Sequence, residues 1–355
     1  MHSLHNHRRA IMTPRSHDWC ERVARSHCPS ASSLAPLREP AAVVASLDTV
    51  DHGRTREGQT GDSTMTTVGT GTYRYEYLPD FPKLPAGQAF GIVSTVATDS
   101  QDHIYVFQRT DQPVMVFDRD GTYLTTWGSG LITDPHGLSI ANDIVYLTDR
   151  SDCVAMAFTL EGTPLQVLGT RGTPSDTGCD KPGDLVPHAA GPFNYPTEMV
   201  ASPSGDLYVS DGYRNARVHR FTREGQLIHS WGEPGKAPGQ FHLPHSIMVA
   251  PDGKVYVCDR SNRRVQIFSA AGEFLTMWTG MGGPNDIVRD KDGAFYICEQ
   301  AADGQPPRLS IRDADGTVMA QWPIRHTHGL WVDSHGDIYL GLTTSHSVDK
   351  YVRVT

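Results

Sequence analysis

Short apolar segments that alternate with polar residues recur along the chain from residue 89 onward. The recurring unit is an apolar strand, a turn, and a second strand of the type "IYVF" or "VYVC". Its six copies begin at Ser94, Pro135, Tyr195, Leu243, Gly283 and His326. The copies follow one another at roughly 40–60 residues, which is the spacing of four-stranded propeller blades.

A second unit follows the first: a strand, a Gly turn, another strand, and Trp-Gly or a relative of it. It has five full copies, such as "VMVFDRDGTYLTTWG", and a sixth that begins as "VDKYVRVT". A propeller must close, because an open blade exposes a strand edge. The alternating segment "TYRYEYLP" (Thr72–Pro79) supplies a suitable outer strand. We therefore expect an all-β fold: one six-bladed β-propeller over residues 65–355, whose last blade is closed by an N-terminal strand at about residues 73–78. A β-solenoid fits the period of about 40 residues and the Trp unit less well.

Two segments lie outside this repeat. Residues 170–194 are rich in Gly, Pro and Asp and indicate a loop, and a loop at a blade junction can cover a site on that rim. Residues 1–64 are rich in Arg, His, Ser and Pro and show no strand alternation. They also lack the apolar core of about 7–15 residues that a secretory signal needs. We expect residues 1–64 to form an extension outside the fold, with Met65 as an alternative start and the cytoplasm as the location.

Charge and cysteine spacing narrow the function classes. The chain of 355 residues carries 31 Lys and Arg against 40 Asp and Glu, a formal charge of −9. That balance argues against nucleic acid or an anionic membrane surface as a partner. The six cysteines show no CxxC spacing, so no zinc knuckle or redox motif is indicated. No apolar run approaches the roughly 18 residues of a membrane helix.

The residue that begins the first strand of each copy alternates in a regular way. These six positions, here named the slot positions, are occupied by Ser94, His136, Thr197, His245, Asn285 and His328. The inner strands of a propeller run along its axis, so three alternate slots converge from directions about 120° apart. A single histidine at a strand start is commonly bonded to a backbone carbonyl, but three buried imidazoles that meet need more partners. A metal supplies them, and zinc held by three histidines with an open fourth position is a catalytic arrangement.

A second set of equivalent positions lies at the end of the second strand, about 15 residues further on. Its occupants include Arg109, Arg150, Tyr213, Arg260 and Gln300. An Asp-Arg pair between blades is the common structural role here, and Asp149-Arg150 and Asp259-Arg260 fit that role. Arg109 follows Gln and Tyr213 follows Gly, so both break the repeat and are site candidates. An arginine suits a carboxylate through a two-point contact, and a tyrosine beside zinc can act as a base.

The sequence resembles the NHL-repeat propellers and, among them, the peptidyl-α-hydroxyglycine α-amidating lyase domain. The similar segments cover nearly the whole propeller, and they include "DPHGLSI", "FNYPTEMVASPSGDLYVSDGYRNARVHRFTREGQLIHSWG" and "LPHSIMVAPDGKVYVCDRSNRRVQIF". The resemblance implies a catalytic zinc on three histidines, which fall on His136 in "DPHGL", His245 in "LPHSI" and His328 in "HTHGL".

The same resemblance assigns further roles. It places the family's tyrosine of "SDGY" on Tyr213 and its two active-site arginines on Arg260 in "CDR" and Arg109 in "FQR". It also implies a reaction on a carbinolamine whose hydroxyl proton is lost with the help of zinc and a tyrosinate. The C–N bond then breaks to give glyoxylate and an amide, while arginine holds the carboxylate. The expected partner is therefore a small-molecule or peptide-like substrate with a carboxylate, rather than a nucleic acid or a membrane.

The chain departs from the family pattern at two places. The residue after the third histidine is Gly329 instead of an acidic residue, so one ligand of the family's structural calcium is missing. Cys258 has no cysteine partner in the following strand "RRVQIF", so the family's paired cysteines are not reproduced.

Two other function classes stay open at this point. A non-catalytic NHL scaffold that binds a partner on its rim explains the fold but not the three alternate histidines. A propeller lactonase or related hydrolase would use calcium, for which Glu198, Asn285 and Asp286 are candidate ligands. The metal separates the three classes: none for the scaffold, calcium for the lactonase and zinc for the lyase.

Overall fold

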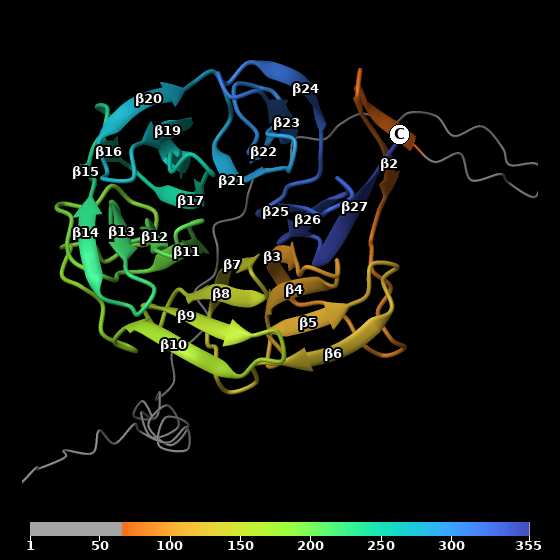
Figure 1. Ribbon diagram of the computed structural model, residues 1–355, viewed down its shortest axis with the longest axis horizontal. Helices are drawn as coiled ribbons and strands as arrows, with labels where there is room; N and C mark the ends of the chain where they lie inside the picture. Colours follow the sequence, from red (N-terminus) through yellow and green to blue (C-terminus); the bar gives the residue numbers. More distant parts are fainter. Residues whose placement is uncertain (1–65, 355) are drawn as a thin grey trace, which may run out of the picture. The chain divides into compact units, whose positions relative to one another are not determined.

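The computed structural model describes residues 66–354, which form a six-bladed β-propeller (Figure 1). The blades are antiparallel sheets, and their innermost strands contact one another around the ring. The predicted fold is therefore confirmed. The expected extension, residues 1–64, and Met65 lie outside the described residues. Among residues 66–354, no helix has the length and apolar character of a membrane span.

The first three blades follow the order of the chain, from the axis to the rim. Blade 1 consists of β3 (Ile92–Thr98), β4 (Ile104–Arg109), β5 (Val114–Phe117) and β6 (Tyr123–Trp127). Blade 2 consists of β7 (Pro135–Ala141), β8 (Ile144–Asp149), β9 (Val154–Thr159) and β10 (Pro164–Gly169). Blade 3 consists of β11 (Pro196–Ala201), β12 (Leu207–Asp211), β13 (Arg217–Phe221) and β14 (Leu227–Trp231).

Blades 4 and 5 repeat this order after a short parallel pair, β15 (Glu233–Pro234) and β16 (Gln240–Phe241). Blade 4 consists of β17 (Pro244–Val249), β18 (Val255–Asp259), β19 (Arg264–Phe268) and β20 (Phe274–Trp278), with the 3-10 helix η1 (Arg260–Asn262) after β18. Blade 5 consists of β21 (Pro284–Arg289), β22 (Phe295–Glu299), β23 (Arg308–Arg312) and β24 (Val318–Pro323).

Blade 6 joins the two ends of the described chain. Its inner strands are β25 (Gly329–Val332), β26 (Ile338–Leu342) and β27 (Ser347–Arg353). The N-terminal strand β2 (Tyr73–Leu78) pairs antiparallel with β27, and β1 (Thr66–Thr70) adds a fifth strand that the sequence did not predict. Tyr75 of β2 is fully buried, with its ring 5.4 Å from that of Trp322 and its hydroxyl 3.1 Å from that of Tyr296. The closing strand thus completes the core between blades 5 and 6.

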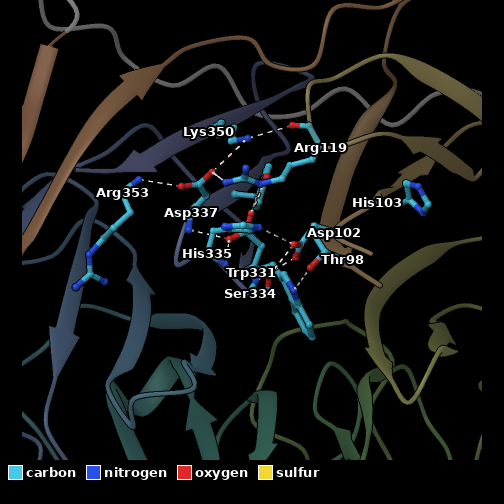
Figure 2. Close-up of polar contacts among 12 residues, drawn as sticks. Thr98, Asp102, His103, Arg119, Trp331, Ser334, His335, Asp337, Lys350 and Arg353 are labelled. Carbon is cyan, nitrogen blue, oxygen red and sulfur yellow. Dashed lines mark hydrogen bonds and ion pairs between the residues drawn. The ribbon is translucent and has the colours of Figure 1, made fainter. Parts of the chain in front are cut away.

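Polar contacts also join blade 6 to blade 1, at the end of the inner strands opposite the slot positions (Figure 2). Arg119 of blade 1 donates from Nη2 to the buried Asp337 at 2.7 Å, and Lys350 of β27 lies 3.4 Å from the same carboxylate. The Ser334 hydroxyl donates to Asp102 of blade 1 at 2.7 Å. These bonds connect the first blade to the last and so help to close the ring.

The repeated Gly turn and Trp have a common packing role. The Trp at the end of one blade lies over the Gly turn of the next, where a side chain has no room. A Cβ at Gly162 would lie 2.6 Å from Trp127, and one at Gly316 would lie 2.3 Å from Trp278. The Gly turn and the Trp that mark the repeat in the sequence therefore form the contact that sets the spacing between neighbouring blades.

Candidate metal centre and active site

Five of the six slot positions lie in β-bulges at the start of the inner strands, and the sixth, His328, directly precedes β25. β17 pairs with β18 through Pro244 and Ser246, and the register skips His245 between them. Strands β3, β11 and β21 show the same skip at their slots, and in β7 the register passes over both His136 and Gly137. A bulged residue has no partner in the ladder, and the bulge re-aims its side chain. This local irregularity explains how side chains of separate blades can meet at the axis.

The structure brings the three slot histidines together. One ring nitrogen from each of His136, His245 and His328 lies within 4.8 Å of the corresponding nitrogens of the other two. The ring centroids are 5.0 Å apart for His136 and His245, and 4.7 Å apart for each of these rings and that of His328. The three residues form a group that could hold a metal ion.

A closed circle of hydrogen bonds fixes these side chains. Each histidine donates from Nδ1 to the backbone carbonyl of the next slot: His136 to Thr197 (2.7 Å), His245 to Asn285 (2.7 Å) and His328 to Ser94 (2.8 Å). Each of the other slots donates to the carbonyl just before the next histidine: Ser94 to Pro135 (2.8 Å), Thr197 to Pro244 (2.9 Å) and Asn285 to Thr327 (2.6 Å). A carbonyl oxygen only accepts, so each Nδ1 carries the proton and each Nε2 presents a lone pair.

The Nε2 atoms have the surroundings that a metal ligand needs. Those of His136 and His328 are buried without a hydrogen-bond partner among the described residues. Burial lowers the pKa of all three histidines, for His328 to about 3. The nearby charge of Arg260 lowers the pKa of His245 and His328 further. The three imidazoles are therefore neutral at pH 7 and ready to bind a cation without losing a proton.

Tyr213 lies against this triad. Its phenol oxygen is 3.3 Å from His245 Nε2 and accepts a hydrogen bond from Arg260 Nη1 at 3.1 Å, and its ring centroid is 5.1 Å from that of His136. Strand β12 ends two residues earlier, at Asp211. The strand-free segment 170–194 then holds the backbone, because Gly183 N donates to the carbonyl of Tyr213 at 2.6 Å. This segment is the loop that the sequence indicated, and it positions the tyrosine.

Three guanidinium groups surround the same phenol and triad. Arg260 has no carboxylate within ion-pair distance in the described part of the chain, and its Cζ lies 5.1 Å from the centroid of the Tyr213 ring. Arg109 and Arg150 share one carboxylate, with Nε 3.4 Å and 2.9 Å from Asp134 respectively. Arg150 Cζ lies 5.0 Å from the centroid of the Tyr213 ring. Asp134 and Arg150 were not assigned to the site from the sequence, and the cluster as a whole is electropositive.

The predicted pairs Asp149-Arg150 and Asp259-Arg260 are wrong. Arg150 pairs with Asp134, and Arg260 bonds to Tyr213 instead of an acid. The acidic residue at the end of the second strand instead accepts backbone N–H groups from the linker that enters the inner strand of its own blade. The bonds run from Thr133 and Asp134 to Asp149, from His242 and Leu243 to Asp259, and from Gly282 to Glu299. The acid is structural, and the next residue is left free to face the site.

The residues that follow the slots form a second tier beneath the histidines. A Cβ at Gly329 would lie 2.3 Å from the Thr95 hydroxyl and 2.5 Å from its Cα, so no side chain fits there. Asp286 accepts hydrogen bonds from the Ser246 hydroxyl (2.7 Å) and from two backbone N–H groups. Burial raises the pKa of Asp286 to about 6 and, with Asp286 nearby, that of Glu198 well above its usual value. Both carboxyl groups therefore favour the protonated form more than an exposed carboxyl group does.

Comparisons with known proteins agree with this architecture. The NHL repeat model matches residues 193–221 and 241–268. NHL repeat-containing protein 3 of Mus musculus is 30% identical over 287 residues, which cover 74% of this chain and 80% of that protein. Peptidyl-alpha-hydroxyglycine alpha-amidating lyase 1 of Drosophila melanogaster is 35% identical over 176 residues, 46% of this chain and 30% of that protein.

Among solved structures, a gluconolactonase of Xanthomonas campestris superposes with a TM-score of 0.57 at 13% identity, over 82% of this chain and 95% of that one. At this identity the likeness concerns the fold alone. The relatives found by sequence are stronger evidence for the family, because the similarity includes the repeats and extends across most of the propeller. The chain therefore belongs to the NHL-repeat family of β-propellers, and its relatives there include a peptidyl-α-hydroxyglycine α-amidating lyase.

Proposed function

We propose that the protein is a zinc-dependent lyase that cleaves the C–N bond of an α-hydroxyglycine-type carbinolamine into an amide and glyoxylate. One observation carries the proposal: three neutral histidines present Nε2 lone pairs to one point, directly beside a tyrosine hydroxyl and an arginine without a carboxylate partner. The relationship to an amidating lyase supports the same reaction class.

The residues fit a zinc ion. His136, His245 and His328 would hold it through Nε2, because their Nδ1 protons are committed to backbone carbonyls. Neutral imidazoles fixed by such bonds are typical zinc ligands, and three protein ligands leave a coordination position open. When bound, zinc supplies Lewis acidity to an oxygen of the substrate. Two otherwise unsatisfied buried nitrogens gain a partner in the same step.

The side chains around the triad divide the remaining tasks. The Tyr213 oxygen would take the hydroxyl proton of the carbinolamine and then return a proton to the departing nitrogen. Arg260 would bind the substrate carboxylate through Nε and Nη2, which make no hydrogen bond within residues 66–354, while Nη1 stays on the phenol oxygen. Arg109 has both of its Nη atoms free in the same way, because only its Nε bonds to the Pro135 carbonyl (3.1 Å).

The charge of the site selects an anion. Arg109 and Arg150 share one carboxylate, that of Asp134, and Arg260 has none, so the cluster carries a surplus positive charge even without a metal. A substrate carboxylate would bind there strongly, since charge-assisted hydrogen bonds in a partly buried site are about twice as strong as neutral ones. The substrate class is thus a small-molecule or peptide-like carbinolamine with a free carboxylate.

The test is direct. The metal-free protein is incubated with N-acetyl-α-hydroxyglycine before and after addition of one equivalent of zinc, and glyoxylate and acetamide are quantified. We expect the two products in equal amounts, with zinc required and no redox cofactor needed. A zinc-loaded protein that releases no glyoxylate from this substrate or from longer N-acyl homologues would refute the proposed reaction.

A further inference from the structure

Arg150 is a third guanidinium in the site, and the roles proposed above leave it without a function. Its Cζ lies over the Tyr213 ring, and its charge adds to the effect of burial in lowering the pKa of His136 and His328. The guanidinium therefore lies beside the tyrosine that contacts the triad. Its side chain is 21% exposed, which leaves it accessible to a small molecule.

Asp134 holds Arg150 in a defined orientation. Nε and Nη2 donate to the two carboxylate oxygens at 2.9 and 3.3 Å, while Nη1 makes no hydrogen bond within residues 66–354. Asp134 is itself fixed, since its backbone N–H donates to Asp149 and its carbonyl accepts from Arg150 N at 3.0 Å. One terminal N–H group of Arg150 is thus preorganised and free, as donors aimed at a developing charge are in enzyme sites.

One hydrogen-bond acceptor of the substrate has no donor among the residues assigned so far. An N-acyl α-hydroxyglycine carries a carboxylate, a hydroxyl and an acyl oxygen. Arg260 and Arg109 suit the carboxylate, and Tyr213 with the histidine triad suits the hydroxyl. When the C–N bond breaks, its electron pair moves onto the nitrogen and is shared with the acyl oxygen. A donor at that oxygen would be worth most in the transition state.

We propose that Arg150 Nη1 donates to the acyl oxygen of the substrate and stabilises the negative charge that develops there as the C–N bond breaks. This inference rests on the proposed function and deepens it, because it assigns a donor to the acyl oxygen of the amide that leaves. The step balances without a further reactant. The Tyr213 oxygen takes the hydroxyl proton, the O–H electron pair becomes the new C=O bond of glyoxylate, and the C–N pair leaves with the nitrogen. The phenol then protonates that nitrogen to give the neutral amide.

The test compares Arg150→Met with a matched control, Arg220→Met. Arg220 also donates from Nε and Nη2 to one carboxylate, that of Asp206, and its Cζ lies 5.6 Å from the centroid of the Tyr208 ring. Its side chain is 24% exposed, close to the value for Arg150, but it lies away from the triad. With zinc-loaded protein, we expect kcat/KM for N-acetyl-α-hydroxyglycine to fall about 100-fold in Arg150→Met. The control should stay within twofold, and Arg150→Lys should recover part of the loss.

Binding of unreactive ligands separates the acyl oxygen from the carboxylate. N-acetylglycine has both groups, whereas glyoxylate has the carboxylate without the acyl group. Both act as competitive inhibitors, and their binding should respond differently. Arg150→Met should weaken the binding of N-acetylglycine about tenfold and leave the binding of glyoxylate unchanged. Arg260→Met should weaken both inhibitors.

Three results would overturn this assignment. If wild type is active and Arg150→Met keeps kcat/KM within threefold, the guanidinium does not act on the reaction. If Arg150→Met weakens the binding of both inhibitors equally, the Arg150 guanidinium binds the carboxylate and not the acyl oxygen. If wild type releases no glyoxylate at all, the proposed function fails, and the role of Arg150 fails with it.

Discussion

Substitution of Tyr213 by Phe removes one oxygen atom and leaves the ring contacts in place. That oxygen has two partners, His245 Nε2 at 3.3 Å and Arg260 Nη1 at 3.1 Å. In the metal-free protein both partners lose a hydrogen bond, so we expect the free energy of unfolding to fall by about 1–2 kcal/mol. With zinc on His245, only the bond from Arg260 is lost, and the difference should shrink to about 1 kcal/mol. The rate of glyoxylate release should fall 10²–10⁴-fold, the range for loss of a general base.

The assay measures glyoxylate release by zinc-loaded wild type, Tyr213→Phe and Tyr195→Phe. Tyr195 is the matched control, because its ring also lies near Arg150, with 5.9 Å between the centroid and Cζ, while its hydroxyl makes no hydrogen bond within the described residues. We expect Tyr195→Phe to keep wild-type activity and all three proteins to bind equal zinc. Equal activity of Tyr213→Phe and wild type would show that Tyr213 takes no part in the reaction. An equal loss of activity in both variants would show that the loss comes from a general disturbance around Arg150 and not from the missing phenol oxygen of Tyr213.

Two further predictions concern the fold and the histidines. Tyr75→Ala should lower the free energy of unfolding by about 3–5 kcal/mol, because it empties a fully buried position on the closing strand, whereas the exposed Arg74→Ala should change it by less than about 0.5 kcal/mol. Equal denaturation midpoints for the two variants would contradict the closure by β2. In the metal-free protein the pKa of His328 is held at about 3, below the unfolded value near 6.5, so its contribution to stability is complete above pH 6.5 and is lost as the pH falls. Between pH 8 and 5.5 wild type should therefore lose about 1.4 kcal/mol more than His328→Gln, and parallel pH profiles would show that His328 is not kept neutral by the fold.

The sequence was sufficient for the fold because each blade repeats the same two hairpin-like units. The alternating Tyr73, Tyr75 and Tyr77 also identified the strand that closes the ring. The edge strand β1 was missed because "TTVGT" is short, polar and mostly exposed, and carries no alternation. The convergence of the slot histidines followed from repeat alignment, since equivalent positions of a closed ring face one axis.

The hydrogen-bond partners were not predictable in the same way. His136 bonds to the carbonyl of Thr197, and this contact between blades leaves no pattern in the sequence because every residue has a carbonyl. Adjacent Asp149 and Arg150 were interpreted as a pair, yet successive residues at a strand end point to opposite sides. Asp149 therefore turns to the linker of its own blade while Arg150 reaches the site. Only the structure shows that Asp134 is the true partner of Arg150.

Binding of a zinc ion by the three slot histidines is tested most directly by metal analysis of the purified protein. Elemental analysis should find about one zinc per chain in wild type. His245→Ala should lose most of the zinc while its circular dichroism remains that of a folded propeller, since the core between the blades does not include this residue. His229→Ala, which removes an exposed histidine from β14, should keep the metal. Failure of wild type to take up zinc, binding of calcium in its place, or full zinc retention by His245→Ala would show that the slot histidines do not form a zinc site.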